Sequence, residues 1–448
     1  MTDYDVLSNL CDEFRKNNYI DPNDFSRYHV KRGLRNEDGT GVMAGLTAIC
    51  SVRGYMIDDG ERIPTHGELL YRGISVDDIV AGCDEDDRFG FEEVVWLLMF
   101  GHLPDAKKLQ WFNGVLSDMR ELPQYFAEDM IIKAPSKNIM NKLARSVLAL
   151  YSYDDNPDDT SLENAIRQCL GLIAKLPAIM SYAYQVKRRN FDGKSMYFHP
   201  IKPGHSTAEC ILTLLRPNKK FTDREAKILD RCLMLHADHG GGNNSTFATR
   251  VLSSTGTDSY AAISAAIGSL KGPKHGGANI KVAEMMKDMI ANIKNVEDEA
   301  QVRDYLVKIL RREANDKSGL VYGMGHAIYT ISDPRAQLIK GMARELADLN
   351  GLHREFCLLE SVERLTPTVM SELKGKKVEI CANVDLYSGL VYRALGIPED
   401  LYTPMFAVAR IAGWSAHRIE ELTSGGKIMR PAYKSVVDRT VYTKLCDR

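Results

Sequence analysis

Long stretches of the chain carry apolar residues at the three- and four-residue spacing of a helix with one buried face. In residues 138–151 the apolar positions on one such face are Ile139, Leu143, Val147 and Leu150. The same pattern predicts helices over 91–100, 164–187 and 277–294. Strand signals are weak, and the best two candidates are 44–52 and 376–381. We therefore predict an all-α or nearly all-α fold.

A length of 448 residues exceeds what one simple core usually holds, so we expect two domains. The charges nearly balance, with 58 lysines and arginines against 60 aspartates and glutamates. Such a chain has no broad electric field for nucleic acid or for an anionic membrane, so neither is expected as a partner. A local basic pocket for a small anion is still compatible with this balance.

The cysteines and the N-terminus predict a cytoplasmic protein. The nine cysteines are scattered, and none forms a C-x-x-C pair. Single thiols of this kind are typical of buried small side chains in a reducing compartment. The N-terminal segment is acidic and amphipathic without the apolar core of a signal peptide, and no apolar run suggests a membrane span.

Three glycine-rich loops concentrate histidine, which occurs only eleven times in the chain. They are HADHGGGNNS (236–245), GPKHGGAN (272–279) and YGMGHAIYTISDPRA (322–336). Glycine lets the backbone approach a ligand closely, and loops carry binding and catalytic residues more often than helix interiors do. One such histidine is most simply structural, but three such loops in one chain favour a functional site.

A metal site is the sharpest alternative for the first loop. His236, Asp238 and His239 resemble the end of an H-x-H-x-D-H zinc pattern, but the position two before His236 is Met234. H-E-x-x-H is also absent. We therefore predict no metal, with a zinc hydrolase kept as an alternative.

The second loop and a later carboxylate suit chemistry at the carbon next to a thioester. His275 precedes a predicted helix that starts near Gly277, where the helix dipole favours neutral imidazole. A neutral imidazole can donate a hydrogen bond to a carbonyl oxygen that is becoming an enolate. Asp385 precedes the helical stretch 387–395, so it is either a helix cap or a base that takes a proton from carbon.

Three arginines near these motifs complete the pattern, and they are Arg335, Arg410 and Arg430. Singly, each is most simply a surface or salt-bridge residue. Together with the histidines they suit a dicarboxylate, because the forked guanidinium donors match carboxylate oxygens.

From about Gly45 to Tyr433 the chain resembles the citrate synthase family. The resemblance is strongest in HADHGGGNNS, GPKHGGAN, GMGHAIYTISDPR and NVDLYSGLVYRALGIP, which occur in the family's order. It implies a homodimer of two-domain helical subunits. The large domain would comprise 1–275 and 391–448, the smaller mobile domain would comprise 276–390, and residues 1–43 form a possible arm.

The resemblance also implies the reaction and the residues that carry it out. His275 matches the histidine that stabilises the acyl-CoA enolate, and Asp385 matches the base that removes the methyl proton. His326 matches the histidine that polarises and protonates the ketone of oxaloacetate. The positions that match holders of the substrate carboxylates are His239, Arg335 and Arg410, with Arg430 reaching into the partner's site. The loop positions that match the CoA-binding loop are Gly323, Met324 and Gly325.

The chain departs from many family members at two places. Gly240 follows His239 where glutamate is common, and Ala327 and Thr330 stand where a basic residue near the CoA phosphates is common. The phosphate ligands therefore cannot be named from sequence. Acetyl-CoA is the expected acyl donor and no tightly bound cofactor is expected. The alternatives are a 2-methylcitrate synthase that uses propionyl-CoA and a non-catalytic binding protein on the same fold.

Overall fold

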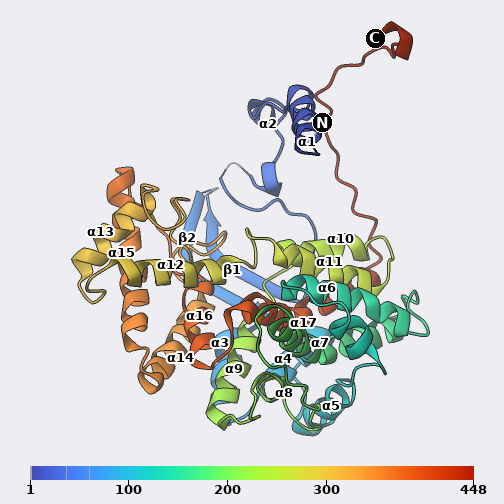
Figure 1. Cartoon of the computed structure of the whole chain (residues 1–448), viewed down its shortest axis with the longest axis vertical. Helices are drawn as coiled ribbons and strands as arrows, with labels where there is room; N and C mark the ends of the chain where they lie inside the picture. The colour runs from blue at the N-terminus through green and yellow to red at the C-terminus, as the bar shows by residue number, and fades with distance from the viewer. Residues whose placement is uncertain (1–2, 37, 60) are drawn as a thin grey trace. The chain divides into compact units, whose positions relative to one another are not determined.

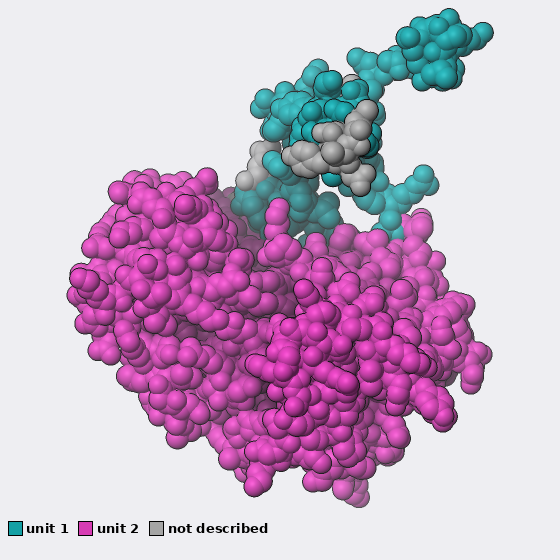
Figure 2. Space-filling model, in the orientation of Figure 1, with its two compact units in different colours: residues 1–44, 429–448 teal, residues 45–428 magenta. Residues whose placement is uncertain are grey.

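The computed structural model describes residues 3–36, 38–59 and 61–448, with the backbone alone at residues 3–5 and 17. The chain divides into two compact units, which Figure 2 shows in different colours. One is the continuous segment Gly45–Ile428. The other combines the two ends of the chain, Met1–Ala44 and Met429–Arg448.

The unit built from the chain ends is small and largely exposed. It contains the helices α1 (Asp3–Asn17) and α2 (Asn23–Arg27) and, near the C-terminus, the short helix η5 (Leu445–Asp447). The Lys434 ammonium lies 5.4 Å from the centre of the Tyr28 ring, so the two ends of the chain contact each other. The predicted arm 1–43 falls in this unit, although its residues 1, 2 and 37 lie outside the described residues, and its packing on a partner stays a prediction.

The unit Gly45–Ile428 is mostly helical with one small sheet, which confirms the predicted fold class. Its helices are α3 (Val76–Glu85), α4 (Phe91–Phe100), α5 (Ala106–Asp118), α6 (Ile139–Ala149), α7 (Leu162–Phe191), α8 (Thr207–Leu215), α9 (Asp223–His236), α10 (Asn244–Ser253), α11 (Ser259–Lys271), α12 (Ala278–Asn292), α13 (Glu299–Leu310), α14 (Pro334–Asn350), α15 (His353–Lys374), α16 (Asp385–Ala394) and α17 (Tyr402–Thr423). The four predicted stretches are α4, α6, α7 and α12, within a few residues at each end. The predicted apolar face is confirmed, because Ile139, Leu143 and Val147 of α6 are buried, and so is Leu150 directly after the helix.

Two groups of helices make up this unit. The central helix α17 packs against α4, α7, α9, α10 and α11. The second group consists of α12 to α16 and lies at the left of Figure 1. In it α14 packs against α15 and α16, while α12 contacts α16 and α13 contacts α15. The second group begins with α12 at Ala278 and ends with α16 at Ala394, and the proposed domain boundaries at 276 and 390 stay a prediction.

Helix α7 has the length and hydropathy that a membrane span would need, the one case among the described helices. However, 83% of its most apolar window is buried inside the protein. Burial of this extent is that of a core helix, which needs apolar residues on all sides for packing rather than for contact with lipid.

The strand predictions were mostly wrong. The sheet consists of β1 (Cys50–Asp58), β2 (Glu61–Tyr71) and the short β3 (Ile74–Ser75) in sequence order, with antiparallel pairing. The candidate 44–52 overlaps β1 by only three residues, and β2 was not predicted. The candidate 376–381 is an irregular segment beside which only one bridge forms, between Met324 and Ala382. It has strand-like composition but no neighbouring strand along its length among the described residues, so no ladder can form.

The hairpin formed by β1 and β2 packs tightly against the third histidine loop. A Cβ atom at Gly67 would lie 2.1 Å from the Ser332 carbonyl oxygen, and one at Gly54 would lie 2.8 Å from that of Ile328. The Gly67 N–H also donates to the Ser332 hydroxyl at 3.1 Å. Glycine is therefore required at both positions, and the hairpin fixes the course of the loop.

Candidate active site

The three histidine loops, which lie far apart in the sequence, meet at one place in the unit Gly45–Ile428. The rings of His239 and His326 stand nearly perpendicular with their centres 5.1 Å apart. Burial is the main reason that the pKa of His239 falls well below its usual value, and the nearby Arg335, His326, Arg410 and His275 lower it further. Four other residues predicted for the site thus lie within electrostatic reach of His239.

The hydrogen bonds of His326 fix which ring nitrogen carries the proton. Its Nδ1 accepts from the backbone N–H groups of Ile328 and Tyr329, each at 3.1 Å. In the neutral ring the hydrogen is therefore on Nε2. The Tyr329 ring stacks on that of His326 at 4.6 Å between centres, which holds the imidazole plane. His326 is thus set to donate a hydrogen bond through Nε2.

His275 lies immediately before α12 and contacts Ser245 at the start of α10. Its Nε2 is 3.1 Å from the Ser245 hydroxyl oxygen, and the Trp414 indole N–H donates to that same oxygen at 3.1 Å. Burial, with a smaller effect of Arg410, lowers the pKa of His275 to about 4. The ring is therefore neutral at neutral pH, as the sequence suggested, although burial is the main physical cause.

Asp385 is the first residue of α16, and it does not cap that helix. The cap position is Val384, and the Asp385 N–H donates to the side-chain oxygen of Asn383 at 3.0 Å. Burial raises the pKa of the Asp385 carboxyl to about 6, with opposing effects of Arg335 and Asp333. A carboxylate that is ionised at neutral pH and has a raised pKa is a better proton acceptor than an ordinary aspartate.

Asn383 joins Asp385 to the loop predicted to bind CoA. The Asn383 side-chain amide donates to the Gly325 carbonyl and its backbone N–H donates to the Gly323 carbonyl, both at 2.9 Å. Gly323 and Gly325 have φ of +81° and +94°, a region that favours glycine. A Cβ atom at Gly323 would also lie 2.8 Å from a Leu386 side-chain carbon. One residue thus connects the predicted base, the glycine loop and, through that loop, His326.

Several buried nitrogen atoms at this place have no hydrogen-bond partner among the described residues. They include both terminal nitrogens of Arg410 and the Nε2 atoms of His236 and His239. The Arg410 Nε, by contrast, donates to the His236 carbonyl at 2.8 Å. A buried polar group without a partner costs about 1–3 kcal/mol, so a cluster of them around a guanidinium indicates an anionic ligand.

Arg335 differs from Arg410 because it already has a carboxylate partner. Its Nε and Nη2 donate to the two oxygens of Asp333 at 3.0 and 2.7 Å. This pair leaves Arg335 as a fixed positive charge beside His239 rather than an arginine with all its donors available.

Within the described parts of the chain, no three His, Cys, Asp or Glu side chains lie close enough to hold a metal ion. His236 Nδ1 is 2.6 Å from the Cys232 carbonyl, and Asp238 contacts His417 Nε2 at 3.1 Å. Two of the three residues of the suspected zinc pattern, His236 and Asp238, therefore contact other groups of the protein.

Four residues that contribute to this arrangement were not predicted, and they are Ser245, Tyr329, Asn383 and Trp414. Three of them lie inside or next to the quoted motifs, where a polar or aromatic residue close to a histidine is the available signal. Trp414 offers no such signal, because only the packing of α17 against α10 brings it to Ser245.

Arg430 lies in the unit of the chain ends, and its side chain is exposed. The structure describes each unit by itself, so the predicted reach of Arg430 into a partner's site stays a prediction.

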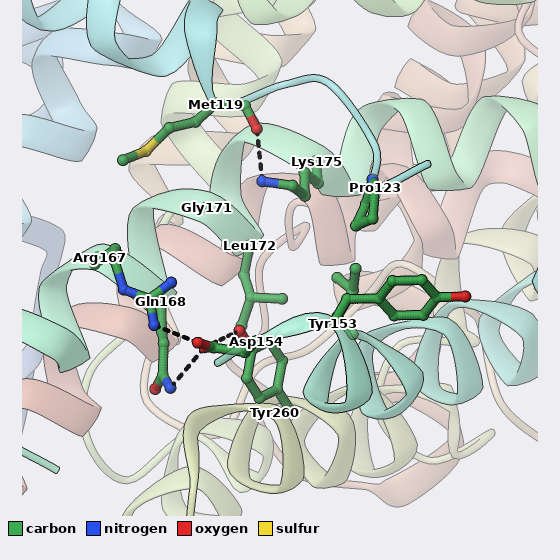
Figure 3. Close-up of a pocket in the computed structure, with 11 residues that line it drawn as sticks. Met119, Pro123, Tyr153, Asp154, Arg167, Gln168, Gly171, Leu172, Lys175 and Tyr260 are labelled. Atoms are coloured by element: carbon green, nitrogen blue, oxygen red, sulfur yellow. Dashed lines mark hydrogen bonds and ion pairs between the residues drawn. The ribbon is translucent and has the colours of Figure 1, made fainter. Parts of the chain in front are cut away.

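A separate cavity of about 230 Å³ lies between α7, α11 and the segment around Asp154. Figure 3 shows that its polar groups bond to one another: Asp154 accepts from Arg167, Gln168 and Tyr260, while Lys175 donates to the Met119 carbonyl. None of the predicted site residues lines this cavity.

Comparison with known proteins identifies the family. The model of the citrate synthase C-terminal domain matches residues 36–432. The chain belongs to the citrate synthase family. It is 33% identical to citrate synthase from Synechocystis over 86% of this chain and 89% of that protein. It is also 31% identical to 2-methylcitrate synthase 1 from Corynebacterium glutamicum, over 92% and 97%.

Solved structures of the family share the fold. The match to citrate synthase from Thermoplasma acidophilum, in a ternary complex with carboxymethyl coenzyme A and oxaloacetate, has a TM-score of 0.74 at 26% identity and covers 94% of this chain and 99% of that one. The match to citrate synthase from Thermotoga maritima has a TM-score of 0.72 at 28% identity, with the same coverage. The chain is therefore an enzyme of the citrate synthase type.

Proposed function

We propose that the enzyme condenses acetyl-CoA with oxaloacetate and water to give citrate and CoA at the site formed by His275, His326 and Asp385. The observation that carries this proposal is the combination of three features at one place. They are a carboxylate with a raised pKa, two histidines set as hydrogen-bond donors, and a buried arginine with two donors that lack partners. A protein that only binds a ligand has no use for a carbon base.

The first step is removal of a methyl proton. The Asp385 carboxylate accepts a proton from the methyl group of acetyl-CoA, and the electron pair moves onto the thioester oxygen. His275 donates a hydrogen bond to that oxygen and so stabilises the enolate. This role requires the hydrogen on His275 Nδ1, with Nε2 accepting from the Ser245 hydroxyl; Trp414 donates to the same serine oxygen, which leaves the serine hydrogen available for His275.

The second step forms the carbon–carbon bond. The enolate carbon attacks the ketone carbon of oxaloacetate, and the ketone oxygen takes the proton from His326 Nε2. Before the next cycle His326 takes a proton back from water and Asp385 releases the methyl proton, so both residues return to their starting states. Arg410 and His239 hold the substrate carboxylates, with Arg335 adding positive charge. Water then cleaves the thioester of citryl-CoA and releases CoA as a thiol. The histidines and arginines supply the electrophilic assistance, so the proposed reaction uses no metal.

Closure of the second group of helices, α12 to α16, over the substrates would keep water out of the site until condensation is complete. The proposed order is oxaloacetate first, because the loop residue His326 and the α16 residue Asp385 belong to that group, whereas His239 and Arg410 belong to the group around α17. A ligand that contacts both groups stabilises the closed arrangement.

Thiol release tests the function and the acyl donor together. The purified enzyme with oxaloacetate is expected to release CoA from acetyl-CoA faster than from propionyl-CoA. The opposite preference would make the enzyme a 2-methylcitrate synthase, an alternative that the Corynebacterium relative supports. One methyl group is worth only about 1–3 kcal/mol in an apolar pocket, so the ratio of kcat/KM should be measured rather than activity alone. Release from neither donor would leave only a binding function on this fold.

If the enzyme is a homodimer in which Arg430 binds substrate in the partner's site, dimers that combine two different inactive variants should recover activity. The variants Asp385→Asn and Arg430→Ala should each be nearly inactive alone. In a mixed dimer, one site receives both defects and the other receives none, since the intact Asp385 and Arg430 meet there. With equal amounts and random exchange, about half the dimers are mixed, so roughly a quarter of full activity should return under two-fold symmetry.

Co-expression with two affinity tags supplies the mixed dimers, and sequential purification on both tags verifies them. If Arg430 served its own chain, every site in the mixture would carry one defect. Verified mixed dimers without recovered activity would therefore show that Arg430 does not act across the interface.

A further inference from the structure

The loop that carries His326 contains one positive charge, Arg335, and that charge is paired with Asp333. Between Ser318 and Pro334 the sequence has neither lysine nor arginine. An acyl-CoA brings a diphosphate and a 3′-phosphate, which the pantetheine arm keeps at a distance from the reacting thioester. We therefore expect other elements near the site to supply cations for these phosphates.

The β1–β2 hairpin brings one arginine to this loop. Arg62 Nη2 donates to the Ile328 carbonyl at 3.3 Å, and Ile328 is the residue whose N–H binds His326 Nδ1. The Arg62 guanidinium also lies over the Tyr55 ring at 4.1 Å. Tyr55 and Arg62 are diagonal neighbours across the two strands, because Ile57 pairs with Arg62 and Tyr55 pairs with Pro64.

The charge of Arg62 has no carboxylate partner within the described residues, although its side chain is half-buried. Arg53 on the same hairpin differs, because it is paired with Glu68 and more exposed. A guanidinium held in place by a ring and a carbonyl, with further donors and no counter-ion, is suited to a phosphate group.

We propose that Arg62 is a binding residue for the phosphate groups of the acyl-CoA substrate. It supplies from the hairpin the cation that positions 327 and 330 of the loop do not supply. This proposal rests on the proposed acyl-CoA condensing function and adds a substrate-binding residue to it.

The test compares acyl donors that retain or lack the phosphates. For Arg62→Ala, KM for acetyl-CoA should rise about tenfold, the usual size of one lost charge-assisted hydrogen bond. KM for oxaloacetate and kcat should stay close to those of the unchanged enzyme. With acetyl-pantetheine, which has no phosphate, the variant and the unchanged enzyme should have the same KM. Acetyl-dephospho-CoA, which lacks only the 3′-phosphate, then identifies the phosphate that Arg62 contacts. If the variant no longer raises KM with this donor, the contact is with the 3′-phosphate. If KM still rises, the contact is with the diphosphate.

Two further variants separate charge from structure. Arg62→Lys should keep most of the affinity because it keeps the positive charge, and Arg53→Ala is the matched control that should leave every KM unchanged. An equal loss in Arg62→Ala with acetyl-CoA and acetyl-pantetheine would overturn the proposal, since Arg62 would then act by holding Ile328 and His326. Calorimetric titration of CoA and of pantetheine in the presence of oxaloacetate gives the same comparison without turnover. It therefore distinguishes failure of this proposal from failure of the proposed reaction.

Discussion

Asp385→Asn is expected to lower kcat by a factor on the order of 10² or more, the usual contribution of a general base. The amide has nearly the same shape as the carboxylate, and the backbone N–H bond from residue 385 to Asn383 does not involve the changed side chain. Oxaloacetate affinity should therefore change little. Stopped-flow measurement of enolate or thiol formation, together with calorimetry for oxaloacetate, separates the two quantities.

The pH profile gives this prediction a second measurement. The base must be ionised to accept a proton, and the pKa of Asp385 is raised to about 6. As pH rises through about 6 the carboxyl loses its proton, so kcat/KM for acetyl-CoA should increase to a plateau. His275, with a pKa lowered to about 4, is already neutral over this range. The asparagine variant should lack the rise near pH 6. Near-normal turnover in that variant, or an unchanged profile, would refute the assignment of Asp385 as the base.

Arg410→Met is expected to weaken oxaloacetate binding by about 10²-fold or more, since truncating one partner of a buried charged pair costs about 2–5 kcal/mol. The same change should cost little folding stability without substrate. Arg410 is fully buried, yet both terminal nitrogens lack partners, and only its Nε donates to a carbonyl. Loss of that bond costs about 1 kcal/mol, and removal of an unpaired buried charge offsets it.

Arg418 on the same helix is a matched control. It is also buried, but its nitrogens donate to Ser259, Ser253 and the Thr257 carbonyl. Arg418→Met should therefore lower the free energy of unfolding by roughly 2–4 kcal/mol, because partners are left unsatisfied, without changing oxaloacetate affinity. Thermal unfolding with and without oxaloacetate measures both effects. Equal destabilisation by the two substitutions, with binding intact in both, would mean that Arg410 is only structural.

The sequence by itself determined the helical fold and suggested the chemistry that we propose for the site. Apolar spacing located α4, α6, α7 and α12, because a helix that buries one face must repeat its apolar residues at the helical period. The glycine-rich motifs around His239, His275 and His326 indicated a functional site, because three such loops in one chain are harder to explain as structural features than one is. These signals are local, and each can be recognised without knowledge of the partner segment.

Only the tertiary structure decided which groups lie close together and which protonation state each of them has. The segment 376–381 has strand-like composition, but no described strand lies beside it. The strands β1 and β2, by contrast, pair with each other along most of their length. The proton position on His326 depends on two backbone N–H groups, and the raised pKa of Asp385 depends on burial. The approach of Arg62 to Ile328 joins residues 266 positions apart. Pairing, burial and long-range contact are properties of the packed chain, so no local pattern in the sequence contains them.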